Sequence, residues 1–119
     1  QAVHQLGGYR MQRDIDRLMA DAEAAAHAGA CAVILECVPR EVAATITQSI
    51  AVPTIGIGAG PQCDGQVLVM HDLVGLSIGR VPRFVRAYAD VKASIGDALA
   101  RWKHDVEHGR FPGPEETLG

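Results

Sequence analysis

Two short, mainly apolar runs limit the folds that this chain can adopt. The first covers residues 30–35 and the second covers residues 53–58, with a segment of helical spacing between them. An apolar run without polar alternation is typical of a strand buried on both faces, and parallel strands joined by helices are the usual setting for such strands. The pattern therefore predicts a parallel α/β architecture, either a doubly wound sheet or part of a barrel.

Helical spacing precedes and follows the first run. Apolar residues recur at intervals of three and four over Asp14–Ala28, with Asp14 as a candidate N-cap and Gly29 as a candidate left-handed stop. A second helix is expected from Pro39, because the first turn of a helix tolerates proline. The predicted order thus begins helix, strand, helix, strand.

The second half of the chain adds one strand and a long helical segment. A third strand is expected over Gln66–His71. From Pro82 onward the apolar spacing predicts a long helix or two, with Gly96 as the weakest point. Glycine and proline from Gly109 onward are expected to end all helix.

Chain length indicates that this domain is incomplete. A (β/α)8 barrel needs about 200 to 250 residues, whereas this chain has 119 residues and begins at Gln1 rather than at Met. Three strands that are buried on both faces cannot close into a barrel by themselves, and their free edges require a partner surface. We therefore expect part of a single domain, with no second domain within residues 1–119.

Composition argues against several classes of function. The formal net charge is −3 and aromatic residues make up 4%, which leaves neither a basic nucleic-acid face nor a stacking platform. The longest weakly polar stretch, residues 50–61, is far shorter than the roughly 20 apolar residues that cross a bilayer. The three cysteines lack C-x-x-C spacing, which favours reduced thiols and a cytoplasmic location, with Cys31 and Cys37 as small core residues.

Glu36 is the candidate catalytic residue. It is a single carboxylate at the carboxyl end of a predicted buried strand, and parallel α/β folds gather their chemistry at that end. Apolar surroundings disfavour an ionised carboxylate, which makes it a better general base. The alternative is a glutamate that turns outward to solvent where the strand ends.

Three other patterns have simpler explanations. Residues 56–60 contain the first two glycines of a dinucleotide fingerprint, but Pro61 stands where the third is needed, so a tight loop or close backbone approach is equally expected. Residues 104–108 match H-x-x-E-H, yet they lie on the polar side of the last helix, and we interpret the match as accidental. His71 and Asp72 either line a pocket or cap a turn, and we favour the turn.

Four motifs together resemble those of the ketopantoate hydroxymethyltransferase (3-methyl-2-oxobutanoate hydroxymethyltransferase) family. They are residues 7–10, 35–39, 53–60 and 64–72. The resemblance extends over nearly the whole chain. It implies a (β/α)8 TIM barrel with parallel strands, of which residues 1–119 are the carboxyl-terminal part with an added C-terminal helical segment.

The resemblance also implies an activity. In this family Mg²⁺ chelates 3-methyl-2-oxobutanoate, a glutamate removes the C3 proton, and the enolate attacks the one-carbon unit of 5,10-methylenetetrahydrofolate to give 2-dehydropantoate for pantothenate biosynthesis. By motif match that glutamate is Glu36. The Mg²⁺ ligands lie in the amino-terminal half, so residues 1–119 are expected to supply no metal ligand and to be inactive alone.

The resemblance further implies a small-molecule 2-oxo acid substrate, the missing amino-terminal half of the barrel as a partner, and a homo-oligomer, typically a decamer. Family members usually have several more residues between the positions of Gln12 and Arg13, so a short loop is expected there.

Two further hypotheses come from other classes of function. In the first, the chain is a non-catalytic β/α module that binds a phosphorylated ligand in the loop of residues 56–65. In the second, it is an assembly module that completes the sheet or barrel of another chain.

Overall fold

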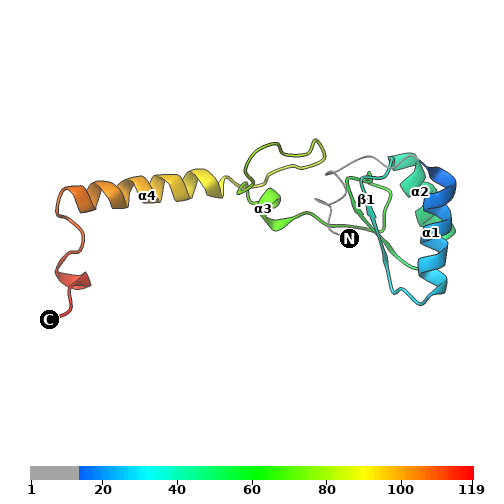
Figure 1. Ribbon diagram of the computed structural model, residues 1–119, viewed down its shortest axis with the longest axis horizontal. Coiled ribbons are helices and arrows are strands. Elements are labelled where there is room, and N and C mark those ends of the chain that lie inside the picture. The colour runs from blue at the N-terminus through cyan, green and yellow to red at the C-terminus, as the bar shows by residue number, and fades with distance from the viewer. Residues whose placement is uncertain (1–13) are drawn as a thin grey trace. The chain divides into compact units, whose positions relative to one another are not determined.

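The computed structural model describes residues 14–119, so the predictions on residues 7–10 and at Gln12 lie outside it. Its elements are, in chain order, α1 (Ile15–His27), β1 (Val33–Glu36), α2 (Arg40–Ser49), β2 (Thr54–Ile57), β3 (Gly65–Gln66), α3 (Met70–Leu73), α4 (Val91–Glu107) and the 3-10 turn η2 (Pro114–Glu116) (Figure 1). The chain divides into two compact units, a first that contains residues 14–69 and 82–85, and a second that contains residues 70–81 and 86–119.

The first unit is built on a parallel sheet with strand order β1-β2-β3. In the register of β1 and β2, Ile34 is the partner of Ile55, and Glu36 is the partner of Ile57. Both strands run in the same direction, with α2 as the connection between them. The predicted parallel α/β architecture is confirmed.

Helix α1 forms as its sequence predicts. The side chain of Asp14 accepts a hydrogen bond from the backbone N–H of Arg17 at 3.2 Å, which satisfies one of the free donors of the first turn. At the other end Gly29 has a φ of 92°, a left-handed conformation that most other residues avoid. Local signals therefore fix both ends of this helix.

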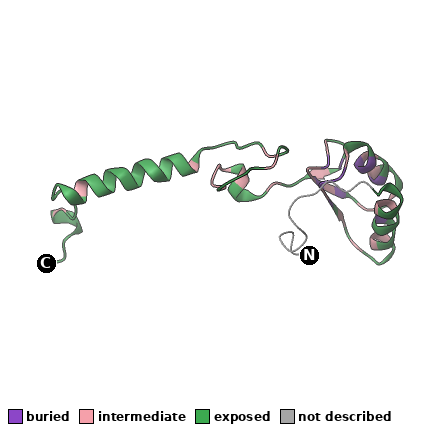
Figure 2. Cartoon of the chain, turned by 45° about the horizontal axis from the view of Figure 1, so that its top comes forward, coloured by how far each residue is buried: buried purple, intermediate pink, exposed green. Residues whose placement is uncertain are grey.

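The core of the first unit lies between the sheet and the two helices α1 and α2. Figure 1 shows both helices on one side of the sheet, and Figure 2 shows buried residues within this layer. The core members are Ala22, Leu35, Val38, Val42, Ala43, Ile46, Ala59 and Cys63. Packing these side chains against one another supplies most of the apolar burial of the unit.

The opposite side of the sheet differs from the sequence prediction. Successive residues of a strand point to opposite faces, and Leu35 is 5% exposed whereas its neighbour Ile34 is 64% exposed. Strand β1 is therefore buried on one face only among the described residues, because no described helix of this unit covers the other. We call this side, formed by Ile34, Glu36, Ile55 and Ile57, the uncovered face.

The connection from β2 to β3 is short and contains no helix. Parallel strands usually need a crossover of about a dozen residues or more, but residues 58–64 suffice here. The fully buried Thr54 stabilises the connection, because its backbone N–H donates to Oδ2 of Asp64 at 2.8 Å. The Thr54 and Thr47 hydroxyl oxygens lie 2.7 Å apart, which joins the network to α2.

The third strand is shorter than predicted. We expected a strand over Gln66–His71, but β3 covers Gly65–Gln66 and Met70–Leu73 form the short helix α3. The ladder ends with the Val67 N–H, which donates to the Gly56 carbonyl at 3.0 Å. Strand β2 ends one residue beyond Gly56, and Gly58 turns away with a φ of 62°, so later residues have no partner strand.

The second unit corrects the predicted start of the last helix. Helix α4 begins at Val91, not near Pro82. The backbone N–H groups of Tyr88 and Val91 donate to the carbonyls of Leu73 and Val74 at 2.8 and 3.0 Å, which holds the preceding residues in a non-helical path. Gly96 does not interrupt the helix.

Helix α4 has no buried residue. One face carries an exposed apolar stripe of Ile95, Leu99, Trp102 and Val106, and the Phe111 ring meets the Trp102 ring edge-on at 6.5 Å between centroids. The tail contains a 3-10 turn at Pro114–Glu116, although we expected helix to end before it. No helix within residues 14–119 is long and apolar enough to cross a membrane.

Candidate functional site

Glu36 is the last residue of β1, so the structure confirms its predicted place at the carboxyl end of a strand. Glu36 is half-buried rather than fully exposed. The backbone N–H of Cys37 donates to the carbonyl of Ile57 at 2.9 Å, which fixes the backbone immediately after Glu36. Since Leu35 points toward the helices, Glu36 belongs to the uncovered face.

Cys37 is next to Glu36 and is the one described non-glycine residue with a positive φ, at 54°. Burial raises the pKa of its thiol, and the negative charge of Glu36 raises this pKa further. A thiol with a raised pKa stays protonated near neutral pH, which makes it a poor nucleophile. The prediction of Cys37 as a core residue is confirmed. The same prediction for Cys31 is wrong, because this residue lies outside β1, which begins at Val33, and is exposed.

The glycines after β2 allow close packing rather than dinucleotide binding. A Cβ on Gly58, whose φ is 62°, would lie 2.8 Å from the Phe84 ring, and one on Gly60 would lie 2.5 Å from Cβ of Arg40. Any side chain at these positions would clash. A helix does not open after these residues; the chain continues to β3.

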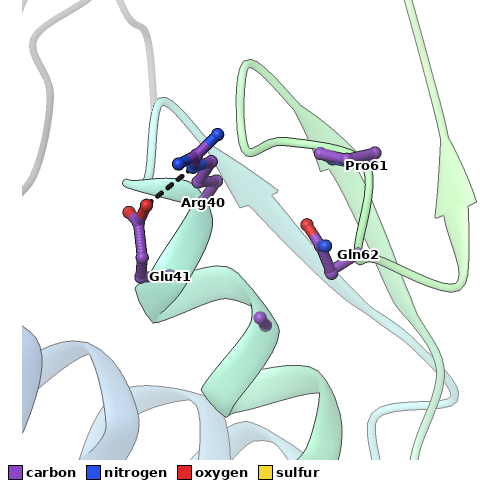
Figure 3. A pocket seen from close by; sticks show the side chains of 5 residues that line it. Arg40, Glu41, Pro61 and Gln62 are labelled. Carbon is purple, nitrogen blue, oxygen red and sulfur yellow. Dashed lines mark hydrogen bonds and ion pairs between the residues drawn. The ribbon is translucent and has the colours of Figure 1, made fainter.

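A shallow pocket of about 420 Å³ lies between the start of α2 and the loop after β2 (Figure 3). Its lining residues are Arg40, Glu41, Ala44, Pro61 and Gln62. The Arg40 Nε donates to Oε1 of Glu41 at 2.6 Å; this hydrogen bond raises the pKa of Arg40 and lowers the pKa of Glu41. Glu36 does not line this pocket, so the pocket and the candidate base are separate features.

The Asp72 side chain stabilises a turn, as we favoured, whereas His71 contributes its backbone carbonyl to the same turn. Both lie in α3. The Asp72 carboxylate accepts a hydrogen bond from the Ser77 hydroxyl, and the His71 carbonyl accepts one from the Leu76 N–H at 2.7 Å. These bonds close the turn that follows α3.

The H-x-x-E-H match on α4 brings two histidines together but does not form a metal site. The rings of His104 and His108 lie 4.1 Å apart between centroids, while Glu107 pairs with Lys103 at 3.6 Å. Across the described part of the chain, no group of three or more histidine, cysteine, aspartate or glutamate side chains could hold a metal ion. The described residues therefore hold no preformed cluster of three ligands for Mg²⁺, an ion that proteins often bind through one or two carboxylates together with substrate and water.

The sequence prediction missed Ile57, which lies directly beside Glu36 on the uncovered face. It also missed the contact of Phe84 with Gly58, which joins residues far apart in the sequence. The register of two strands determines the first feature, and a tertiary contact determines the second. Only the alternation within each strand could have suggested that Ile57 and Glu36 share a face.

In α/β enzymes with parallel strands the site opens at the carboxyl ends of the strands, which is where this sheet places Glu36. Comparison with known sequences identifies the protein family. The chain belongs to the ketopantoate hydroxymethyltransferase family, whose sequence model matches residues 1–114. The recognition of this family from the four motifs is thus confirmed.

Several relatives named 3-methyl-2-oxobutanoate hydroxymethyltransferase match the chain almost completely. The protein from Rhodopirellula baltica is 52% identical over 118 residues, which covers 99% of this chain and 44% of the relative. The protein from Nocardioides sp. is 52% identical, with 99% and 41% covered, and that from Syntrophomonas wolfei is 49% identical, with 99% and 44% covered. The chain therefore spans less than half the length of these relatives and corresponds to their carboxyl-terminal part.

Proposed function

We propose that the protein containing this chain is a 3-methyl-2-oxobutanoate hydroxymethyltransferase that forms 2-dehydropantoate in pantothenate biosynthesis, with 5,10-methylenetetrahydrofolate as cosubstrate. The names of its relatives support the activity. The observation that carries the proposal is the position of Glu36, half-buried at the carboxyl end of β1 on the uncovered face. A phosphorylated-ligand site is not favoured, since Glu41 already pairs with Arg40 in the pocket described beside the glycine loop.

In this proposal Glu36 is the general base. Its carboxylate takes the proton from C3 of the oxo acid, and the electrons of the broken C–H bond pass into the enolate. The enolate carbon then bonds to the one-carbon unit of the cosubstrate. The two bonds from that carbon to tetrahydrofolate nitrogens break, water supplies the hydroxyl oxygen of the product, and tetrahydrofolate leaves with the protons released by C3 and by water. Positioned general bases contribute rate factors of about 10² to 10⁴.

Mg²⁺ would supply a Lewis acid for the keto oxygen. The described residues lack a metal-ligand cluster, so we propose that its ligands lie in the amino-terminal half of the barrel.

The proposed partner of the sheet is the rest of a single (β/α)8 barrel, of which this chain is the carboxyl-terminal part. Strands β1 and β3 each have one free edge in the described sheet, and free edges need pairing. The uncovered face would become the interior of the barrel, where Glu36 lies at the carboxyl end. We further propose a cytoplasmic homo-oligomer in which the apolar stripe of α4 packs against a second copy, because that stripe is exposed along the whole helix.

The test uses what we call the assembled protein: this chain joined to an amino-terminal half, either its own or that of the Rhodopirellula baltica relative. Exchange of the substrate C3 proton in deuterated water, followed by NMR, isolates proton removal from transfer. We expect Glu36→Gln to lower this exchange about 10² to 10⁴-fold, while Glu41→Gln, a matched change at an exposed site, leaves it unchanged. Near-normal exchange in the Glu36 variant would remove the proposed base.

The same preparation tests the need for the missing half. We expect the isolated chain to catalyse neither exchange nor transfer, and the amino-terminal half to restore both on co-expression. Activity of the chain alone would contradict the proposed division of the site.

A further inference from the structure

The neighbour of Glu36 on the uncovered face is Ile57. The two residues are Cα partners in the parallel register of β1 and β2, and neighbouring strands lie about 4.8 Å apart. Paired residues of adjacent strands point to the same face of the sheet, so the side chains of Ile57 and Glu36 lie side by side. Ile57 is half-buried and therefore retains accessible apolar surface.

The structure of the substrate in the relatives' name suggests what Ile57 would contact. In 3-methyl-2-oxobutanoate, C3 carries one hydrogen and two methyl groups. When the base reaches the C3 hydrogen, both methyl groups on C3 lie close to the residues beside the base. An apolar surface beside the base then receives them, and burial of a methyl group in an apolar site is favourable.

Ile57 is better placed for this contact than the other apolar residues of the two strands. Ile34 and Ile55 share the uncovered face but lie two residues closer to the amino ends, which is about 6.6 Å along a strand. Leu35 points into the helix-covered core and is 5% exposed. Of the apolar residues of β1 and β2, Ile57 alone is level with Glu36.

We propose that Ile57 is a specificity-determining residue that contacts the branched alkyl group of the 2-oxo acid beside Glu36. This inference rests on the proposed function and deepens it. It assigns the preference for two C3 methyl groups to one side chain, whereas proton removal stays with Glu36.

The experiment measures kcat/KM of the assembled protein for 3-methyl-2-oxobutanoate and for 2-oxobutanoate, which lacks one C3 methyl group. One methyl or methylene group in an apolar pocket changes discrimination by about 10 to 200-fold. We expect Ile57→Ala to lower the preference for the branched acid about 10-fold or more, and Ile57→Val to lower it by less. Ile55→Val, the same change two residues away, should leave the preference unchanged.

The outcomes separate this inference from the proposed function. If the unsubstituted assembled protein exchanges no C3 proton, the proposed function fails. If it is active and both Ile57 variants keep the original preference, the function stands and the role of Ile57 is wrong. Circular dichroism checks folding, and should Ile57→Ala not fold, Ile57→Val decides, because removal of one methyl group preserves the strand.

Discussion

Helices α2 and α4 are both amphipathic, yet they differ in what their apolar faces contact. Val42, Ala43 and Ile46 of α2 are buried against the sheet. The longer α4 has no buried residue, and its apolar stripe is exposed. An apolar stripe therefore predicts which face of a helix needs cover, but it does not say whether the same chain provides it.

The largest expected effect is in the core beneath α2. Ile46 is fully buried, so Ile46→Ala should leave a cavity and lower the free energy of unfolding by about 2 to 5 kcal/mol. Urea denaturation of the assembled protein, followed by circular dichroism, measures the change.

The matched substitution on α4 is Leu99→Ala, at a residue 59% exposed. Exposed sites usually change stability by within about 0.5 kcal/mol. Analytical ultracentrifugation of the same variant tests whether the stripe packs against a second copy. If it does, we expect the variant oligomer to dissociate at a higher protein concentration than the unsubstituted oligomer. An unchanged oligomer would count against that packing.

Two glycines provide the next comparison. Gly60 has a φ of 82°, and a Cβ there would lie 2.5 Å from Cβ of Arg40. We expect Gly60→Ala to lower the free energy of unfolding by about 1 to 3 kcal/mol, as for other strained backbone sites. A neutral result would mean that the loop after β2 moves away from α2.

Gly96 should show the opposite sign. It lies within α4 and a Cβ there meets nothing within 4 Å. Alanine is a better helix former than glycine by about 0.8 to 1.0 kcal/mol, so Gly96→Ala should raise the melting temperature. A decrease would show that this position contacts another part of the assembled protein.

The smallest expected effect is a change in stability with pH that comes from the Cys37 thiol. The pKa of Cys37 is raised in the folded state by burial and by Glu36, so the stability that its protonated form contributes is present below the unfolded pKa of about 8.5 and is lost as pH rises through the folded pKa. We expect the free energy of unfolding to fall above that pH, and Cys37→Ala to reduce the decline.

Alkylation offers a direct control on the same residues. Cys31 is exposed whereas Cys37 and Cys63 are buried. Iodoacetamide followed by mass spectrometry should therefore modify Cys31 first. Equal rates at all three thiols would contradict the described burial.

Much of the first unit follows from local sequence signals. Asp14 and Gly29 mark the ends of α1 because capping involves residues close in sequence. The prediction was wrong for β3 and for the start of α4, because partners distant in the chain decide both. Strand β3 ends where β2 no longer offers a partner, and the Tyr88 N–H donates to the carbonyl of Leu73, the last residue of α3, instead of continuing a helix.

The sequence by itself determined the order of α1, β1, α2 and β2, the place of Glu36 at a strand end, and membership of the family. Spacing and capping are local properties, so they can be deduced from neighbouring residues. Only the tertiary structure placed Ile57 level with Glu36, packed Phe84 against Gly58 and left one face of the sheet without cover from the helices of residues 14–119. Strand register and long-range packing depend on residues that meet only after folding, so the neighbouring residues in the sequence do not determine them alone.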